Sequence, residues 1–599
     1  MPADPRSIAI DLSRDDLFDP FGLATVKERY LVGDETSPQH AIARASAAFA
    51  DDEAHAQRIY EYASKHWFMF ATPLLANGGT TRGLPISCFL NWVPDSREGI
   101  LNHYTENGWL ASMGGGIGSH WGELRSVGTK TSKGSKTSGV VPFARVVDAQ
   151  MLAFHQGGTR RGSAAVYLPI SHPEIEEWIV MRKVTGGDFN RKTPNLHHAV
   201  SIPDAFMQAV EADLPWDLID PHSKEIRKTV SARHLWRLIL ETRMELGEPY
   251  IFFEDTANRA LPKPLKDIGL RIYSSNLCTE IMLPTGPDPR NGKMRTAVCC
   301  LSSTNLLHFK EWSQEPLFIP DLMRMLDNVL TDYIQRAPAS HAAAVYSASQ
   351  ERSVGLGAMG FHSFLQRNRI AIESDVARAW NVMMFEHIRE QADAASLELG
   401  AERGEAPDMA GTGERFAHKL AIAPNASSSI ICGNVSPSIE PVPANAYGQK
   451  TLSGLNIRWN PECLRLLEEK GMNTPEIAKS IVTRNGSVQH LEGLSDHEKA
   501  VFLTSDEIDQ KALVRLAGDR AGFIDQGQSV NLFFPPDARA KELHDTHILA
   551  WKLGVKSLYY LRPSALKRAE LSALRTERAA APIALATGPA EIECLSCEG

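Results

Sequence analysis

A short polar motif around residue 278 offers the strongest indication of chemistry in the chain. Asn276, Cys278 and Glu280 occupy alternate positions of the string Ser-Asn-Leu-Cys-Thr-Glu-Ile at residues 275–281. If this segment is extended, the amide, the thiol and the carboxylate project from one face. Such a trio suits a reaction in which sulfur takes a hydrogen atom while the carboxylate accepts the proton of a neighbouring hydroxyl. A buried structural cysteine is the commoner explanation of one such residue.

Further cysteines widen the chemistry that is possible. Cys88 lies in the apolar run 85–90, while Cys299 and Cys300 lie in the run 296–302, and both runs read as interior strands. Adjacent strand residues face opposite ways, so only one of Cys299 and Cys300 can share a pocket with Cys278. Two thiols whose Cα atoms lie within about 7 Å can supply two electrons by closing a disulfide. Ordinary core cysteines are the alternative.

A closely spaced pair of cysteines lies almost at the chain end. Cys594 and Cys597 form a Cys-x-x-Cys pair that follows residues 563–593, a stretch rich in Ala, Arg, Glu and Pro without an aromatic residue. We expect a flexible tail that carries a redox pair. The competing explanation is a metal site, but two ligands fall short of the usual four, and no His cluster lies nearby in sequence.

Three other segments have compositions suited to a nucleotide. Residues 423–429 hold three consecutive serines, which could bind phosphate at a helix start or could simply form a turn or cap. The glycines of residues 114–118 lack Rossmann spacing and suggest a loop that allows close ligand approach. Residues 156–162 offer flexible backbone, an amide and two guanidiniums, which suit either a nucleotide sensor or a solvated basic turn.

The elements that must position these residues follow from hydrophobic periodicity. Residues 1–69 read as a small helical region, and residues 70–562 alternate β-type runs with helical segments, as in an α/β domain. The predicted strands include residues 86–93, 139–143, 164–169 and 295–301, and the predicted helices include residues 235–245 and 375–399.

Composition excludes several classes of protein. The 599 residues carry a formal net charge of −9, which gives no overall basic surface for nucleic acid. No stretch approaches the roughly 18 uncharged apolar residues that span a bilayer, and the first residues do not form a signal peptide. Eight cysteines are too few for a secreted disulfide scaffold. We therefore expect a cytoplasmic protein that binds neither nucleic acid nor membranes.

In their order along the chain, these motifs resemble the large catalytic subunits of class I ribonucleotide reductases. Residues 275–281 are similar to the radical-site strand of that family, and the segments around Cys88 and Cys299 resemble the strands that carry its reducing cysteines. The likeness runs from about residue 70 to residue 562. It implies that Cys278 carries a thiyl radical, that Glu280 is the base and that Asn276 binds the substrate. Cys88 and Cys299 would be the redox pair, although the family usually has Asn where this chain has Cys300.

Other matches to the family imply further roles. Tyr559 and Tyr560 match a tyrosine pair that receives oxidising equivalents from a separate small subunit with a metal cofactor. That pair argues against the nearest alternative function, an adenosylcobalamin-dependent class II reductase. A second alternative is a catalytically inactive regulator that only binds nucleotides. The implied substrate contacts are Thr72, Ser87, Gly115, Gly116, Pro424, Asn425, Ala426, Ser427 and Ser428. The implied contacts of a nucleoside triphosphate effector are Asp95, Ser96, Arg125, Gln156 and Arg160.

The resemblance also implies a fold and a set of partners. A ten-stranded α/β barrel over residues 70–562 would follow a helical region, residues 1–69, and precede a flexible tail, residues 563–599. Cys278 would lie on a loop or strand tip inside the barrel. Thioredoxin or glutaredoxin would reduce Cys594 and Cys597, which would then reduce the buried pair. We also expect a homodimer, no cofactor or metal in this chain, and no N-terminal ATP-cone domain, for which there is no room before residue 70.

Overall fold

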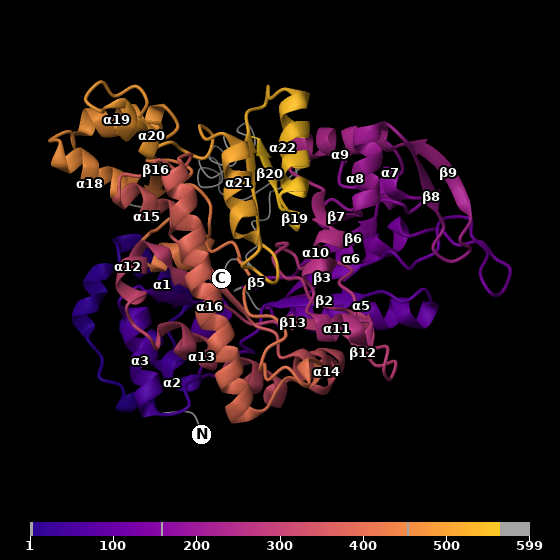
Figure 1. The fold of residues 1–599 in the computed structure, drawn as a ribbon, viewed down its shortest axis with the longest axis horizontal. Helices are drawn as coiled ribbons and strands as arrows, with labels where there is room; N and C mark the ends of the chain where they lie inside the picture. Colours follow the sequence, from indigo (N-terminus) through magenta and orange to yellow (C-terminus); the bar gives the residue numbers. More distant parts are fainter. Residues whose placement is uncertain (1–3, 157–159, 452–453, 564–599) are drawn as a thin grey trace.

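Three helices form the N-terminal part of the protein. The structure, a computed structural model, describes residues 4–156, 160–451 and 454–563. Side-chain caps begin all three helices, with Asp19, Ser37 and Asp52 each accepting a backbone N–H. The third of them contacts the long helix α13 (Phe318–Arg336), so the helical region packs on the rest of the chain (Figure 1). The three helices are α1 (Pro20–Arg29), α2 (Pro38–Ala48) and α3 (Glu53–Ser64).

Five parallel strands form one half of a barrel. Their residues are almost all buried, as expected for a sheet with covered faces. In spatial order they are β2 (Cys88–Trp92), β3 (Gly116–His120), β6 (Ser163–Pro169), β7 (His197–Ile202) and β10 (Tyr250–Phe253). Antiparallel strands flank them, β13 (Ala297–Cys299) beside β2 and β19 (Ser557–Leu558) beside β10. The helices on this half include α5 (Arg97–Ser112), α6 (Val141–Ala153), α7 (Ile175–Ile179) and α9 (Ala232–Leu246) (Figure 1).

The second half of the barrel is built on β14 (Leu301–Asn305) and β15 (Gly355–Met359), which are parallel. Single bridges extend this half, from Leu356 to Leu420 and from Ile422 to Gln528, and β1 (Phe68–Phe70) pairs antiparallel with β14. Near the chain end, β18 (Leu532–Phe534) pairs with β20 (Leu561–Pro563). The long helix α16 (Asp375–Arg403) crosses the molecule and packs on α13 (Figure 1). The expected α/β barrel is confirmed, although its ladders form several sheets rather than one continuous sheet.

Two of the predicted strands are wrong. Residues 139–143 lead into α6, because Glu174 accepts the N–H of Val140 and fixes the turn before a helix with proline in its first positions. Residues 295–301 do not form one strand either. The chain changes sheet at Cys300, so that β13 joins the first half of the barrel and β14 the second. The other predicted strands and helices are confirmed: residues 86–93, 164–169, 235–245 and 375–399.

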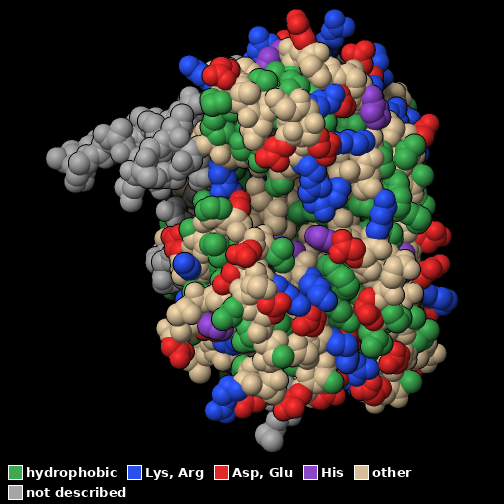
Figure 2. All heavy atoms as spheres, turned by 90° about the vertical axis from the view of Figure 1, so that its left-hand side faces the viewer, with side chains coloured by type: hydrophobic (Ala, Val, Ile, Leu, Met, Phe, Trp, Pro, Cys, Tyr) green, Lys and Arg blue, Asp and Glu red, His purple; other side chains and the backbone are tan. Residues whose placement is uncertain are grey.

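Two peripheral parts complete the fold. The hairpin β8 (Pro215–Ile219) and β9 (Ile226–Ser231) projects from the body, and a second small core lies among α18 (Pro461–Glu469), α19 (Pro475–Thr483) and α20 (Asp496–Val501) (Figure 1). On the face drawn in Figure 2, Lys and Arg side chains are interspersed with Asp and Glu side chains rather than gathered in one basic field. Within the described residues, no helix has the length and apolar character needed to cross a membrane.

Candidate active site

Cys278 lies in a turn rather than in a strand. Thr279 has a φ of +67° and donates its N–H to the Asn276 carbonyl (3.3 Å), so the chain reverses at Cys278. The segment is therefore not extended, and Cys278 lies on a loop, which is one of the two positions that the family resemblance implies. The expected meeting of amide and carboxylate nevertheless occurs, because the turn brings the Asn276 amide to within 2.9 Å of the Glu280 carboxylate. Amide, thiol and carboxylate are all completely buried.

The turn lies inside the barrel and is held there through its backbone carbonyls. Ser529 Oγ donates to the Cys278 carbonyl (2.5 Å), and Ser557 Oγ donates to the Thr279 carbonyl (2.8 Å). From the opposite strand β6, Tyr167 Oη donates to the Asn276 carbonyl (2.6 Å). Ser529 Oγ also lies 3.2 Å from Glu280 Oε2, so one hydroxyl fixes both the thiol-bearing residue and the base. Hydrogen bonds from β6, β19 and the coil at Ser529 thus hold the Cys278 turn in place, as a reactive group requires.

Gly118 provides the space into which this turn enters. A Cβ atom at Gly118 would lie 1.9 Å from the Ser275 carbonyl oxygen and 2.7 Å from the Asn276 Cα atom. We therefore predict that Gly118→Ala displaces the turn and lowers turnover at least tenfold, or by about 1.4 kcal/mol in transition-state stabilisation. Gly522→Ala is the control, because a Cβ atom there has no neighbour within 4 Å. Steady-state turnover per folded enzyme tests this, and equal activity in the two variants would contradict it.

Cys88 and Cys299 are directly opposed on neighbouring strands. They are register partners of the antiparallel pair β2 and β13, so their side chains project to the same face, with Cα atoms about 4.5–5.5 Å apart. That separation is within the range of a disulfide. The Asn276 amide lies 3.6 Å from Cys88 Sγ and joins the pair to the Cys278 turn. We expected that only one of Cys299 and Cys300 would face the active site. Cys299 is the one that does, because it lies opposite Cys88.

The surroundings keep Cys299 in its thiol form. Burial raises the pKa of Cys299 well above its ordinary value, and the nearby sulfur atoms of Cys88 and Cys300 raise it further. Cys300 lies on the other side of the strand, where its Sγ approaches the Leu326 carbonyl at 3.7 Å. Burial also raises the pKa of Cys300, so neither thiol is ionised near neutral pH. A protonated Cys299 can donate hydrogen to a bound group.

Tyr559 and Tyr560 form a close pair of tilted rings that reaches Cys278. Tyr559 is buried and its hydroxyl lies 3.5 Å from Cys278 Sγ, while the rings of Tyr559 and Tyr560 are 4.2 Å apart at an angle of 49°. Tyr560 is only partly buried, so the pair leads from the thiol toward the surface. Sequence reasoning missed a third tyrosine, Tyr250, whose ring centroid lies 4.8 Å from that of Tyr559 and 5.1 Å from that of Tyr560.

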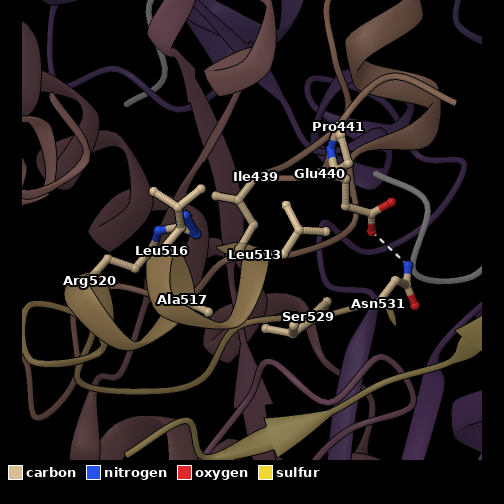
Figure 3. A pocket seen from close by; sticks show the side chains of 10 residues that line it. Ile439, Glu440, Pro441, Leu513, Leu516, Ala517, Arg520, Ser529 and Asn531 are labelled. Carbon is tan, nitrogen blue, oxygen red and sulfur yellow. Dashed lines mark hydrogen bonds between the residues drawn. The ribbon is translucent and has the colours of Figure 1, made fainter. Parts of the chain in front are cut away.

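A small cavity adjoins the residues that support this pair. Figure 3 shows it between α21 (Gln510–Ala521) and residues 439–441, with Ser529 and Asn531 along one wall. Asn531 donates to Glu440 Oε1 (2.6 Å) and accepts the N–H of Tyr560 (3.1 Å), which fixes the backbone of that tyrosine. Sequence reasoning also missed Ser529 and Asn531; the polar run of residues 526–531 was the available signal.

The expected phosphate-binding residues gather at one end of the second half-barrel. Asn425 donates to Ser303 Oγ of β14 (2.9 Å), and Ser428 Oγ donates to the carbonyl of Phe70 (3.4 Å), two residues before Thr72. The serines lie on the short helix α17 (Ala426–Ile431), which contacts β1. Thr72 and the serine segment, including Pro424, Ala426 and Ser427, are thereby brought close together.

The remaining expected substrate residues border the redox pair. Ser87 Oγ lies 3.7 Å from Cys88 Sγ, and the N–H of Gly116 donates to the Ser87 carbonyl (2.6 Å). A Cβ atom at Gly115 would lie 2.8 Å from the Phe89 ring, so this glycine is required by packing within the chain. Gly116 itself begins β3 and pairs with Cys88, so it belongs to a strand and not to the loop expected from the glycine-rich run.

The expected effector residues fall into two groups. Arg125 forms an ion pair with Asp95 (2.8 Å), and Ser96 caps the first turn of α5. Gln156 and Arg160 are register partners in the small hairpin of β4 (His155–Gln156) and β5 (Arg160–Arg161). This hairpin lies toward the other end of α5, because Gly162 approaches Ala111. Within one chain the two groups are not brought together. Cys594 and Cys597 lie outside the described residues.

The comparisons with known proteins agree with this geometry. A family profile described as ribonucleotide reductase, barrel domain, matches residues 86–414 and 408–561, and one described as ribonucleotide reductase, all-alpha domain, matches residues 16–83. The ribonucleoside-diphosphate reductase large subunit of Invertebrate iridescent virus 3 is 42% identical over 650 residues, covering 99% of this chain and 100% of that protein. The corresponding large subunit of Caenorhabditis elegans is 30% identical over 667 residues, covering 100% of this chain and 83% of that protein.

A solved structure gives the same result. The alpha subunit of the Actinobacillus ureae class Id ribonucleotide reductase superimposes with a TM-score of 0.80 at 33% identity, covering 92% of this chain and 97% of that chain. Sequence profiles, full-length relatives and fold therefore converge on one conclusion: the chain belongs to the ribonucleotide reductase large-subunit family.

Proposed function

We propose that this chain reduces ribonucleoside diphosphates to 2′-deoxyribonucleotides as the catalytic subunit of a class I enzyme. The observation that carries the proposal is the position of Cys278: its thiol contacts Tyr559, and Asn276 and Glu280 of the same turn form a buried cluster with Cys88. The names of the relatives, ribonucleoside-diphosphate reductases, support a diphosphate substrate. Family membership implies a small subunit as partner.

The proposed chemistry assigns one step to each group. The Cys278 thiyl radical takes the 3′-hydrogen of the ribose, and Glu280 accepts the proton of the 3′-hydroxyl. A thiol of the redox pair protonates the 2′-hydroxyl, which leaves as water. The second thiol supplies the hydrogen that replaces the hydroxyl at C2′, so that Cys88 and Cys299 give up two electrons and form a disulfide. Glu280 then returns its proton to the 3′-oxygen, and the hydrogen returns from Cys278 to C3′. Burial of all these groups keeps water away from the radical.

The radical route distinguishes class I from class II. We propose that Tyr560 and Tyr559 carry the oxidising equivalent from the radical of a metal-containing small subunit to Cys278. An adenosylcobalamin enzyme would generate the radical beside the cysteine and would have no use for the pair. The similar solved structure is that of a class Id ribonucleotide reductase alpha subunit, which supports the same choice.

Substrate, effector and assembly sites are proposed from the positions described above. Thr72 and residues 424–428 would hold the substrate phosphates, with Ser87, Gly115 and Gly116 near the ribose. Asp95, Ser96 and Arg125 would bind a nucleoside triphosphate effector that Gln156 and Arg160 sense. Exposed apolar side chains on α5 and α6 favour a homodimer through these helices. They are Leu101, Trp109, Val146 and Leu152.

The direct experiment assays the full chain together with its small subunit. We expect dCDP from CDP in the presence of a nucleoside triphosphate effector, and less product from CTP. Deoxynucleotide formed by this chain alone on addition of adenosylcobalamin would contradict the class I assignment. A chain that binds nucleotides but forms no product with an active small subunit would instead be an inactive regulator.

The tail cysteines give a separate prediction. Cys88 and Cys299 are buried, so a protein reductant such as thioredoxin or glutaredoxin cannot reach them directly. Replacing both Cys594 and Cys597 by Ser should stop multiple turnover driven by thioredoxin, while the pre-reduced enzyme still completes about one turnover. A small dithiol should partly restore turnover, since exchange depends on access. Product per chain is the measurement, and unchanged multiple turnover would exclude the shuttle.

A further inference from the structure

The hairpin of β8 and β9 reaches the residues proposed for the effector site. In the loop between these two strands, His222 has its Nδ1 atom 3.3 Å from Asp95 Oδ2. Arg125 pairs with the same carboxylate at 2.8 Å. The His222 side chain is half exposed, so a ligand that lies at this carboxylate can contact the imidazole ring. None of the roles proposed above uses the hairpin.

Asp220 fixes the position of this loop. Its side chain is completely buried, and Oδ2 accepts the N–H of Ser126 (2.8 Å), the Ser126 hydroxyl (2.5 Å) and the Thr129 hydroxyl (2.8 Å). Oδ1 accepts the N–H groups of His222 (3.1 Å) and Ser223 (2.7 Å). One buried carboxylate therefore joins the backbone of His222 to the segment that begins at Ser126.

That segment carries exposed cations. Lys130, Lys133 and Lys136 are all exposed, and Lys130 and Lys136 form an antiparallel bridge. Arg125 donates to the Lys130 carbonyl (3.0 Å), so the segment starts at the ion pair with Asp95. Ammonium groups attract a triphosphate, whereas a carboxylate repels it. The phosphates of an effector would therefore lie along the lysines and its sugar beside Asp95.

The hydrogen-bonding capacity of His222 favours a hydroxyl as its ligand. Arg125 donates to both oxygens of Asp95 through its guanidinium, and its backbone N–H donates to Oδ1. In a neutral His222, this carboxylate favours the tautomer with the proton on Nδ1, which leaves Nε2 as an acceptor. Phosphate oxygens are acceptors too and cannot donate to Nε2, whereas a sugar hydroxyl can.

We infer that His222 is a further effector-binding residue, whose Nε2 atom accepts a hydrogen bond from the 3′-hydroxyl of the bound nucleoside triphosphate. Asp95 is then also a positioning residue, because it fixes the tautomer of the imidazole. The 3′-hydroxyl is the sugar donor that ribonucleotides and 2′-deoxyribonucleotides share, so the same histidine serves effectors with any base. The inference rests on the effector site proposed above and adds the hairpin of β8 and β9 to it.

The first test compares two nucleotides that differ only in this hydroxyl. Binding of dATP and of 2′,3′-dideoxyATP to the full chain is measured at about pH 8, where an ordinary imidazole is neutral, with CDP filling the substrate site. His222→Phe should raise the Kd of dATP about tenfold, as for the loss of one hydrogen bond, and should leave the Kd of dideoxyATP unchanged. Equal weakening of both nucleotides, or of neither, would overturn the inference.

His234→Phe is the matched control for the substitution itself. The His234 side chain is 47% exposed, against 50% for His222, and its Nε2 atom lies 3.4 Å from the Glu176 carboxylate. Because His234 lies on α9 and not beside Asp95, both nucleotides should bind this variant as they bind the wild type. A loss of dATP affinity equal to that of His222→Phe would show that no specific contact is involved.

A third variant separates the failure of this inference from the failure of the effector site. Arg125→Ala removes the ion pair with Asp95 and should weaken dATP and dideoxyATP alike. Unchanged binding of both nucleotides by Arg125→Ala would show that the effector site itself is misplaced. If Arg125→Ala weakens both while His222→Phe changes neither, the effector site stands and the role of the hairpin is excluded.

Discussion

Cys278→Ser should lower ribonucleotide reduction by more than about 1,000-fold while leaving nucleotide binding close to that of the wild type. The hydroxyl is similar in size to the thiol and can keep the contact with Tyr559, but its O–H bond is too strong for it to replace sulfur in hydrogen-atom transfer. No second route to the substrate radical exists in the proposed mechanism, so the loss should be complete rather than partial.

The control for this variant is a cysteine buried elsewhere. Cys463 lies on α18 in the separate small core, and Cys463→Ser should stay active if it folds. Product formation and equilibrium binding of CDP are measured on both variants. Substantial turnover by Cys278→Ser, or loss of CDP binding together with turnover, would show that Cys278 does not carry the radical.

The second large effect concerns the tyrosine that contacts the thiol. Tyr559→Phe should reduce turnover at least about 100-fold, equivalent to ~2.7 kcal/mol of barrier, because the ring remains but can no longer exchange a hydrogen atom with Cys278. Deleting one hydroxyl should cost only about 1 kcal/mol of stability, so the fold survives.

Tyr250→Phe provides the matched control for Tyr559→Phe. Tyr250 is equally buried and packs on both members of the pair, but it is not an assigned step of the route. Its loss should lower turnover far less than the loss of Tyr559. Turnover and small-subunit radical decay on mixing with substrate are compared, and equal effects of the two variants would mean that packing rather than radical transfer explains the result.

The sequence predicted which side chains meet more reliably than it predicted the backbone that brings them together. The grouping of Asn276 with Glu280 was expected from strand alternation, but a turn at Thr279 produces it. The expectation that Cys299 and Cys300 diverge was sound, since it depends only on the two-residue period of a strand. Which of them faces Cys88 depends on the register between β2 and β13, a long-range pairing that local patterns do not contain.

The missed residues share a physical reason. Ser529 supports Cys278 across 251 positions of sequence, and Asp220 holds Ser126 across 94. Each is one polar residue in a short strand or coil, where no local spacing signals a function. The wrong strand at residues 139–143 has a different cause, because its apolar run is a helix start whose proline favours the first turn.

The most direct test follows the two electrons that the substrate receives. The Cys594→Ser and Cys597→Ser double variant is reduced, freed of external reductant and mixed with the small subunit, effector and CDP; dCDP is then counted, and disulfides are mapped by peptide mass spectrometry. We expect one disulfide between Cys88 and Cys299 for each dCDP formed, and neither disulfide nor dCDP when Cys278→Ser is added. Formation of dCDP without a Cys88 to Cys299 disulfide, or with Cys300 in place of Cys299, would contradict the proposed mechanism.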